Sequence, residues 1–270
     1  MSAQEETFIS HLVELRDRVL RSLIAFTVVF LCLFPFAQKL YTLVAGPMLA
    51  ALPSGKEMIA TGVASPFFIP VKVTMMCALV VALPYILYQL WAFVAPGLYT
   101  HEKKLVLPLV VSSTLLFLCG MAFAYFLVLP TVFRFLASFT PQGVSFAPDI
   151  AQYLDFVLTL LIAFGLAFEV PVLVVVLVRV GVVSVEKLKE IRPYVIVGAF
   201  VIGAIFTPPD VISQLMLAVP MWLLYELGIL VAALLVKRAE QREHNLGPSP
   251  HARIEPALDP VEAEREASRD

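Results

Sequence analysis

The apolar residues of this chain fall in long, nearly uninterrupted runs separated by shorter polar segments. Runs of about 18 or more apolar residues are typical of membrane-spanning helices, because ~20 residues at ~1.5 Å each cross a ~30 Å hydrocarbon core. The alternating pattern of a closed β-barrel, the other structure that satisfies its backbone inside lipid, is absent from the sequence. The predicted spans are residues 22–37, 73–94, 105–129, 153–178, 194–206 and 211–236. The pattern therefore predicts an all-α integral membrane protein with six transmembrane helices, of which the fifth is short.

The polar segments at the two ends complete the predicted organisation. Residues 1–21 are expected to form an amphipathic N-terminal helix, because apolar side chains recur there at helical spacing. These side chains are Phe8, Leu12, Leu15 and Val19. The six-span domain then covers residues 22–236. The remainder, residues 237–270, is polar and rich in Pro, Glu and Arg, which favours a disordered tail.

The connection between the first two spans is long and contains several prolines and glycines. Long connections without structure of their own are uncommon, so we expect this one to form an ordered cap with short helices. Prolines inside the predicted spans kink helices unless neighbours compensate, and they favour a curved bundle with a concave face. These are Pro84, Pro108, Pro171 and Pro220.

Basic residues are distributed unequally between the two sides of the predicted spans. Twelve lysines and arginines lie on one side and four on the other, and the two sets alternate from one connection to the next. The richer side holds Arg16, Arg18, Arg21, Lys103, Lys104, Arg179, Lys187, Lys189, Arg192, Lys237, Arg238 and Arg242, and the poorer side holds Lys39, Lys56, Lys72 and Arg134. The positive-inside rule then places both termini in the cytoplasm and the cap in the periplasm.

Composition argues against a soluble domain, and the absence of catalytic motifs argues against an enzyme. Of 270 residues, 60% are hydrophobic and 15% are charged, whereas a soluble domain carries about 25% charged residues. The HExxH, GxSxG and Walker motifs are absent. The three cysteines, Cys32, Cys77 and Cys119, lie inside apolar runs without CxxC spacing, so neither a disulfide nor a metal site is expected. The sequence predicts no catalytic machinery, no metal and no cofactor.

Two carboxylates on the predicted cytoplasmic side are candidates for cation binding. Glu14 lies in the amphipathic N-terminal segment, and Glu102 lies in the turn between the second and third spans. Together they could hold two guanidinium groups, because an arginine fork pairs bidentately with a carboxylate. Alternatively, Glu14 pairs with Arg18 at i,i+4 and Glu102 is a solvated turn residue. From the residues alone, this second interpretation is the simpler one.

Glu169 lies inside an otherwise apolar run, beside Pro171. A charge at the bilayer centre costs at least ~2.5–3.5 kcal/mol on insertion scales, so such a residue faces a partner or a wet cavity, or stays protonated. A functional role is the default hypothesis, and a buried structural hydrogen bond is the alternative. Glu226, in the last span, belongs to the same category.

Several motifs, in order along the chain, resemble those of the TatC family, the core subunits of the twin-arginine protein translocase. They are His11-Leu-Val-Glu-Leu-Arg-Asp-Arg18, Ala64-Ser-Pro-Phe-Phe68, Tyr88-Gln-Leu-Trp-Ala-Phe-Val-Ala-Pro-Gly-Leu98 with His101-Glu-Lys-Lys104, Phe168-Glu-Val-Pro171, Arg192-Pro-Tyr-Val195 and Phe206-Thr-Pro-Pro-Asp210. The resemblance covers about residues 8–236 and leaves the tail outside.

The resemblance implies a receptor in the bacterial inner membrane. Such a receptor binds twin-arginine signal peptides on folded cargo and recruits the single-span subunits TatB and TatA. It works in a multimeric complex in the lipid, driven by the proton motive force and without a nucleic-acid partner. Glu14 and Glu102 match the carboxylates that bind the two arginines, and Phe93 matches a position implicated in signal recognition.

Three further positions match polar residues of the family. Glu169 matches its intramembrane glutamate, for which contact with the signal peptide or with partner helices is the expected role. Thr207 and Gln214 match positions near the partner-helix contact.

Two other classes of protein were considered. A proton-coupled transporter of small solutes could use Glu169, but such proteins usually show internal repeats and a midplane polar cluster, and the sequence has neither. An intramembrane hydrolase needs a nucleophile and base that the sequence does not offer.

Overall fold

The computed structural model describes residues 3–51, 58–94, 106–138, 149–206 and 211–246, and within these ranges the chain is almost entirely helical. Five helical segments are long and apolar enough to cross a membrane, and one apolar helix is shorter. The long segments are Ser10–Gly46, Ser65–Val94, Val106–Leu136, Ile150–Arg179 and Val211–Arg238, and the short one is Arg192–Phe206. This arrangement agrees with the predicted membrane fold and with its short fifth span.

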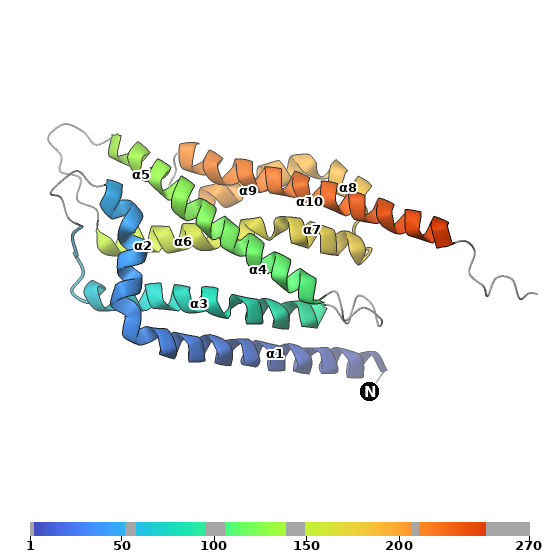
Figure 1. The fold of residues 1–270 in the computed structure, drawn as a ribbon, viewed down its shortest axis with the longest axis horizontal. Helices are drawn as coiled ribbons and strands as arrows, with labels where there is room; N and C mark the ends of the chain where they lie inside the picture. The colour runs from blue at the N-terminus through green and yellow to red at the C-terminus, as the bar shows by residue number, and fades with distance from the viewer. Residues whose placement is uncertain (1–2, 52–57, 95–105, 139–148, 207–210, 247–270) are drawn as a thin grey trace, which may run out of the picture.

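The amphipathic N-terminal segment and the first predicted span form a single helix. Helix α1 (Ala3–Leu33) is continuous through their junction, and the Ser22 hydroxyl donates to the carbonyl of Arg18 one turn earlier, 3.0 Å away. It ends at the short 3₁₀ turn η1 (Phe34–Phe36), where Pro35 lacks the N–H that would continue the helix. Helix α2 (Ala37–Ala51) then turns away from α1 and runs across the end of the bundle (Figure 1). It supplies the short helix expected between the first two spans.

The next two spans are longer than predicted. Helix α3 (Ser65–Val94) begins eight residues before residue 73 and continues past Pro70 and Pro84. Helix α4 (Val106–Phe123) passes through a π-helical turn, η4 (Ala124–Val128), into α5 (Leu129–Ser138). The predicted end of the third span at residue 129, just before Pro130, is therefore wrong. In the π-helical turn, the N–H of Leu129 donates to Ala124 five residues back, and the wider turn lets the helix continue past the proline.

The fourth span breaks where the sequence predicted a kink. Helix α6 (Ile150–Phe168) ends at Glu169, and α7 (Val170–Arg179) starts with Pro171 in its first turn. The short helix α8 (Val185–Glu190) leads to α9 (Arg192–Phe206), which is followed by α10 (Val211–Leu246). Helix α10 continues beyond residue 236, so residues 237–246 are helical and not part of a disordered tail. The rest of the predicted tail lies outside the described residues.

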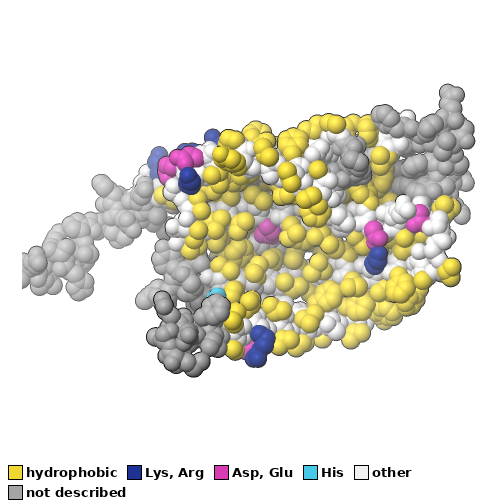
Figure 2. Space-filling model, turned by 180° about the vertical axis from the view of Figure 1, so that it is seen from behind, with side chains coloured by type: hydrophobic (Ala, Val, Ile, Leu, Met, Phe, Trp, Pro, Cys, Tyr) yellow, Lys and Arg dark blue, Asp and Glu magenta, His cyan; other side chains and the backbone are white. Residues whose placement is uncertain are grey.

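The main core lies around α6. The largest fully buried side chains come from α3, the η4–α5 segment, α6 and α10. They include Val73, Val128, Leu129, Leu154, Phe164 and Leu217. Helix α1, in contrast, packs mainly along α3 and leaves most of its apolar side chains exposed. Apolar residues cover most of the face in Figure 2, as expected for a molecule with a lipid-facing belt. Most of the charged residues lie toward its two ends, and an acidic side chain lies in the middle, among the apolar residues.

Candidate functional site

The candidate recognition site lies where α1 packs against α3, at the end of the bundle that also holds the start of α4 (Figure 1). The ring of Phe93, near the end of α3, stacks on the ring of His11 in α1. Their centroids are 4.3 Å apart and the ring planes differ by 23°. This contact joins two motifs that are about eighty residues apart in the sequence.

Glu14 lies on α1 one turn from His11 and pairs with Arg18. The Nε and Nη2 atoms of Arg18 donate to the same oxygen, Oε1 of Glu14, over 3.0 and 2.6 Å. The Oε2 atom takes part in neither bond. The pair predicted at i,i+4 is therefore present. It is partly exposed, at 39% for the Glu14 side chain, so we expect it to contribute only ~0.2–0.5 kcal/mol.

Gln89 is a member of this site that the sequence did not single out. It lies on α3, is 4% exposed, and its Oε1 accepts a long 3.5 Å hydrogen bond from Nη1 of Arg18. A buried glutamine in an apolar span is a signal in itself, because a buried amide needs partners. Its contact with Arg18 depends on how α1 packs on α3, which sequence spacing alone does not reveal.

Glu102 lies outside the described residues. The helix ends that flank its segment, Val94 of α3 and Val106 of α4, lie at the same end of the bundle as the first half of α1 (Figure 1). The sequence prediction required both carboxylates to belong to one face of the membrane. The positions of these helix ends are consistent with that requirement.

Glu169 occupies the break between α6 and α7. Its backbone N–H donates to Leu166, and its carbonyl accepts from Leu173. The side chain meets the Ser113 hydroxyl of α4, while its Oε1 is buried without a hydrogen-bond partner among the described residues. The same Ser113 oxygen accepts a hydrogen bond from Trp91 Nε1 of α3, over 3.1 Å. The hydrogen bond between Trp91 and Ser113 joins α3 to α4 inside an otherwise apolar part of the bundle.

Gln214 ties the last two spans together. Its Nε2 donates to the carbonyl of Phe200 in α9 over 2.9 Å, and Gly203 packs directly against it. Thr207, the other predicted partner-contact residue, lies outside the described residues. Within the described part of the chain, no three His, Cys, Asp or Glu side chains are grouped as a metal site would require.

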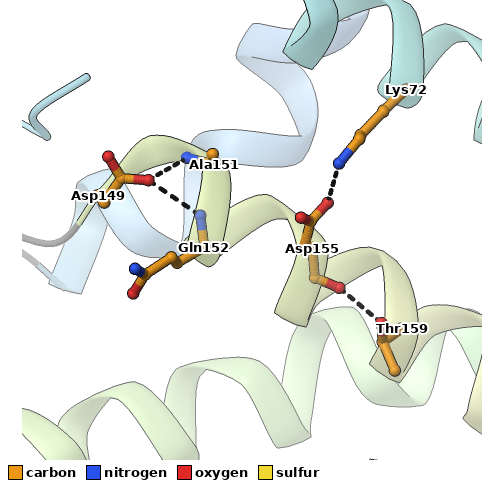
Figure 3. A network of polar contacts seen from close by, with 6 residues as sticks. All are labelled: Lys72, Asp149, Ala151, Gln152, Asp155 and Thr159. Carbon is orange, nitrogen blue, oxygen red and sulfur yellow. Dashed lines mark hydrogen bonds and ion pairs between the residues drawn. The ribbon is translucent and has the colours of Figure 1, made fainter. Parts of the chain in front are cut away.

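The opposite end of the molecule has its own polar network, which sequence analysis missed (Figure 3). Asp149 caps α6 by accepting from the backbone N–H groups of Ala151 and Gln152, and it also accepts from the backbone and hydroxyl of Thr61. Lys72 of α3 pairs with Asp155 of α6 at 2.6 Å. These bonds join the 58–64 segment and α3 to the start of α6.

Comparison with known proteins identifies the family. The family model described as Sec-independent protein translocase protein (TatC) matches residues 10–220. The TatC protein of Azotobacter chroococcum mcd 1 is 56% identical over 248 residues, which cover 92% of this chain and 97% of that protein. The protein of the same name from Escherichia coli strain K12 is 53% identical over 244 residues, covering 90% and 95%.

Solved structures give the same result. A crystal structure described as the twin-arginine translocase receptor TatC matches with a TM-score of 0.74 and 42% identity, covering 83% of this chain and 98% of that one. A second, in the detergent DDM, matches with a TM-score of 0.76, covering 82% and 99%. These matches confirm the predicted six-helix membrane fold and make the chain a component of a protein translocase. The chain belongs to the TatC family.

Proposed function

We propose that this protein is the receptor for twin-arginine signal peptides, with both termini in the cytoplasm of the bacterial cell. Glu14 and Glu102 each bind one arginine of the signal, and Phe93 contacts the peptide beside them. Carboxylates suit this task, because a guanidinium makes two parallel hydrogen bonds to a carboxylate and an ammonium does not.

The observation that carries this proposal is the packing of α1 on α3, with Phe93 stacked on His11 one turn from Glu14. This packing brings together, at one end of the bundle, motif residues that are far apart in the chain. The short helix α8 and the ends of α7 and α10 lie at the same end of the bundle as the N-terminus of α1 (Figure 1). They carry Arg179, Lys187 and Lys237, which supports a cytoplasmic orientation of this end.

Photo-crosslinking of a twin-arginine peptide to the purified protein tests the proposal. Glu14→Gln and Glu102→Gln are each expected to weaken binding at least about tenfold, which corresponds to ~1.4 kcal/mol. Glu190→Gln is the matched control, because Glu190 is an exposed carboxylate at the end of α8 that pairs with Lys187 three residues earlier. Unchanged crosslinking in the Glu14→Gln/Glu102→Gln double variant would contradict the proposal.

The partner subunits form the second part of the proposal. TatB and TatA helices pack on the lipid-facing surface that Glu169 and the α9–α10 pair present, with Thr207 and Gln214 near the contact. The exposed apolar face of α9 supports this, since Tyr194, Val197 and Ile205 are all more than half exposed. Cysteine crosslinking from Val197 or Ile205 to each subunit in membranes tests it. Crosslinks that form equally well from Leu31 on α1 would contradict a specific site.

The solute-transporter alternative is not favoured, because the family comparisons point to protein translocation. Solute uptake by proteoliposomes that contain this chain alone would support the transporter instead. Accumulation of twin-arginine cargo in the cytoplasm of a deletion strain, restored by the intact chain, is the outcome expected of the receptor.

A further inference from the structure

The bond geometry at Glu14 raises the question of what occupies this carboxylate when no signal peptide is bound. In this structure its partner is a guanidinium from the protein itself, that of Arg18. Both hydrogen bonds reach a single oxygen, whereas the strongest arginine–carboxylate arrangement uses both oxygens in parallel. The internal arginine therefore fills the site with a weaker version of the contact that a signal arginine would make.

Arg18 also has a second acceptor within reach. Its Nη1 already points at Oε1 of Gln89, 3.5 Å away, and this oxygen belongs to a nearly buried side chain on the neighbouring helix. The Arg18 side chain itself is 21% exposed, so its charge needs a partner if Glu14 is withdrawn. A small shift of the guanidinium toward Gln89 would shorten a hydrogen bond that is now long and would release the carboxylate.

We propose that Arg18 is a resident placeholder that an incoming signal arginine displaces from Glu14, with Gln89 receiving the displaced guanidinium. This inference rests on the proposed receptor function. Displacing Arg18 is a cost that every cation must meet before it reaches Glu14, so the placeholder lowers the affinity of the site. A signal arginine offsets this cost with two parallel hydrogen bonds to the carboxylate, which a lysine cannot form.

The test measures binding of a twin-arginine peptide to the full-length protein in detergent. Removing the placeholder with Arg18→Gln is expected to strengthen this binding at least about threefold, because the Glu14 carboxylate no longer has to be released from Arg18. Arg21→Gln is the matched control, because Arg21 is an exposed arginine one turn further along α1. Binding that is unchanged or weaker in Arg18→Gln, or that strengthens equally in Arg21→Gln, would overturn the proposal.

Two further variants separate this inference from the receptor function and from misfolding. In a Glu14→Gln background, Arg18→Gln should leave twin-arginine binding unchanged, because the carboxylate for which Arg18 competes is gone. An equal gain in that background would overturn the placeholder. If Glu14→Gln alone fails to weaken twin-arginine binding, the receptor function fails instead.

Gln89→Met provides a second test of the exchange if the Arg18→Gln protein does not fold. It removes the acceptor for the displaced guanidinium while keeping similar side-chain volume. Twin-arginine binding should weaken about threefold with the thermal midpoint of the unliganded protein retained. Unchanged binding in this variant would overturn the exchange.

Discussion

The Nη2 of Arg192 lies 2.6 Å from Oε2 of Glu226, so the first turn of α9 is tied to the middle of α10 by an ion pair. Glu226, like Glu169, is a carboxylate within a predicted span. Its ion pair with Arg192 compensates its charge there. The hydroxyl of Tyr225, the preceding residue, donates to the carbonyl of Leu188 over 2.8 Å and holds α8 against the same helix.

Breaking this ion pair is expected to destabilise the α8–α10 region. Arg192→Met or Glu226→Gln should each cost about 1–2 kcal/mol and lower the thermal midpoint in detergent, because one charge is left half-buried. The double variant should recover part of the loss. The exposed pair of Lys187 and Glu190 is the control, and its removal should change the midpoint little. An equal effect of the two pairs would show that burial does not matter here.

Helices α4 and α6 cross closely at Gly120. A Cβ atom added there would lie 2.4 Å from the carbonyl oxygen of Phe164, which is backbone and cannot move aside. Gly120→Ala is therefore expected to cost about 1–3 kcal/mol by overpacking. Gly198→Ala on α9 is the control, since a Cβ there meets nothing within 4 Å. The thermal midpoints of both variants in detergent test this, and a stable Gly120→Ala protein would contradict the close crossing.

Tyr125 supports a helix that contains a proline. Pro47 has no N–H to donate to the carbonyl of Leu43 four residues earlier, and the Tyr125 hydroxyl donates to that carbonyl over 2.6 Å. Tyr125→Phe should therefore destabilise the contact between α2 and the η4 turn by about 1 kcal/mol. Hydrogen exchange of α2 should increase in this variant. The exposed Tyr194 serves as the control, and Tyr194→Phe should change nothing.

The hydrogen bonds to Asp149 predict how the stability of the fold depends on pH in acid. Hydrogen bonds from the Thr61 hydroxyl and backbone, together with the N–H groups that it caps, lower the pKa of Asp149 from 3.8 to about 2. Because the pKa is lower in the folded protein, the charged side chain stabilises the fold fully above pH ~4. That contribution is lost as the pH falls from about 4 to about 2.

Asp149→Asn should therefore lower the thermal midpoint at pH 7. The difference from the unmodified protein should shrink as the pH approaches 2, because protonated aspartic acid loses the same charge. Thermal unfolding followed in an acid-stable detergent at several pH values tests this. A difference that stays constant with pH would show that the hydrogen bonds do not depend on the charge of Asp149.

The fold was predictable from the sequence wherever hydrophobic length alone decided the structure. The apolar runs 194–206 and 211–236 correspond to α9 and to most of α10, and the break at Glu169 follows from Pro171. The start of α3 was missed because Lys72 looked like the polar end of a loop. Its partner Asp155 is 83 positions away in the sequence, and that pairing lets a charge sit within the helix.

The candidate site was predictable in its residue types but not in its contacts. The i,i+4 spacing of Glu14 and Arg18 predicted their ion pair, and the structure contains it. The stacking of His11 on Phe93 and the contact of Arg18 with Gln89 depend on α1 packing along α3, which is a tertiary relationship. Glu102 lies outside the described residues, and its role stays a prediction.

The π-helical turn Ala124–Val128 determines the direction in which the later side chains of the third span point from the helix axis. An extra residue in one turn rotates all later side chains by ~100° about the helix axis. Val132 and Phe133 point into the core because of that rotation. Deleting one exposed residue from this turn would rotate the buried face of α5 toward lipid. The packing of α2 against α5 would then be lost, although every core residue would be retained.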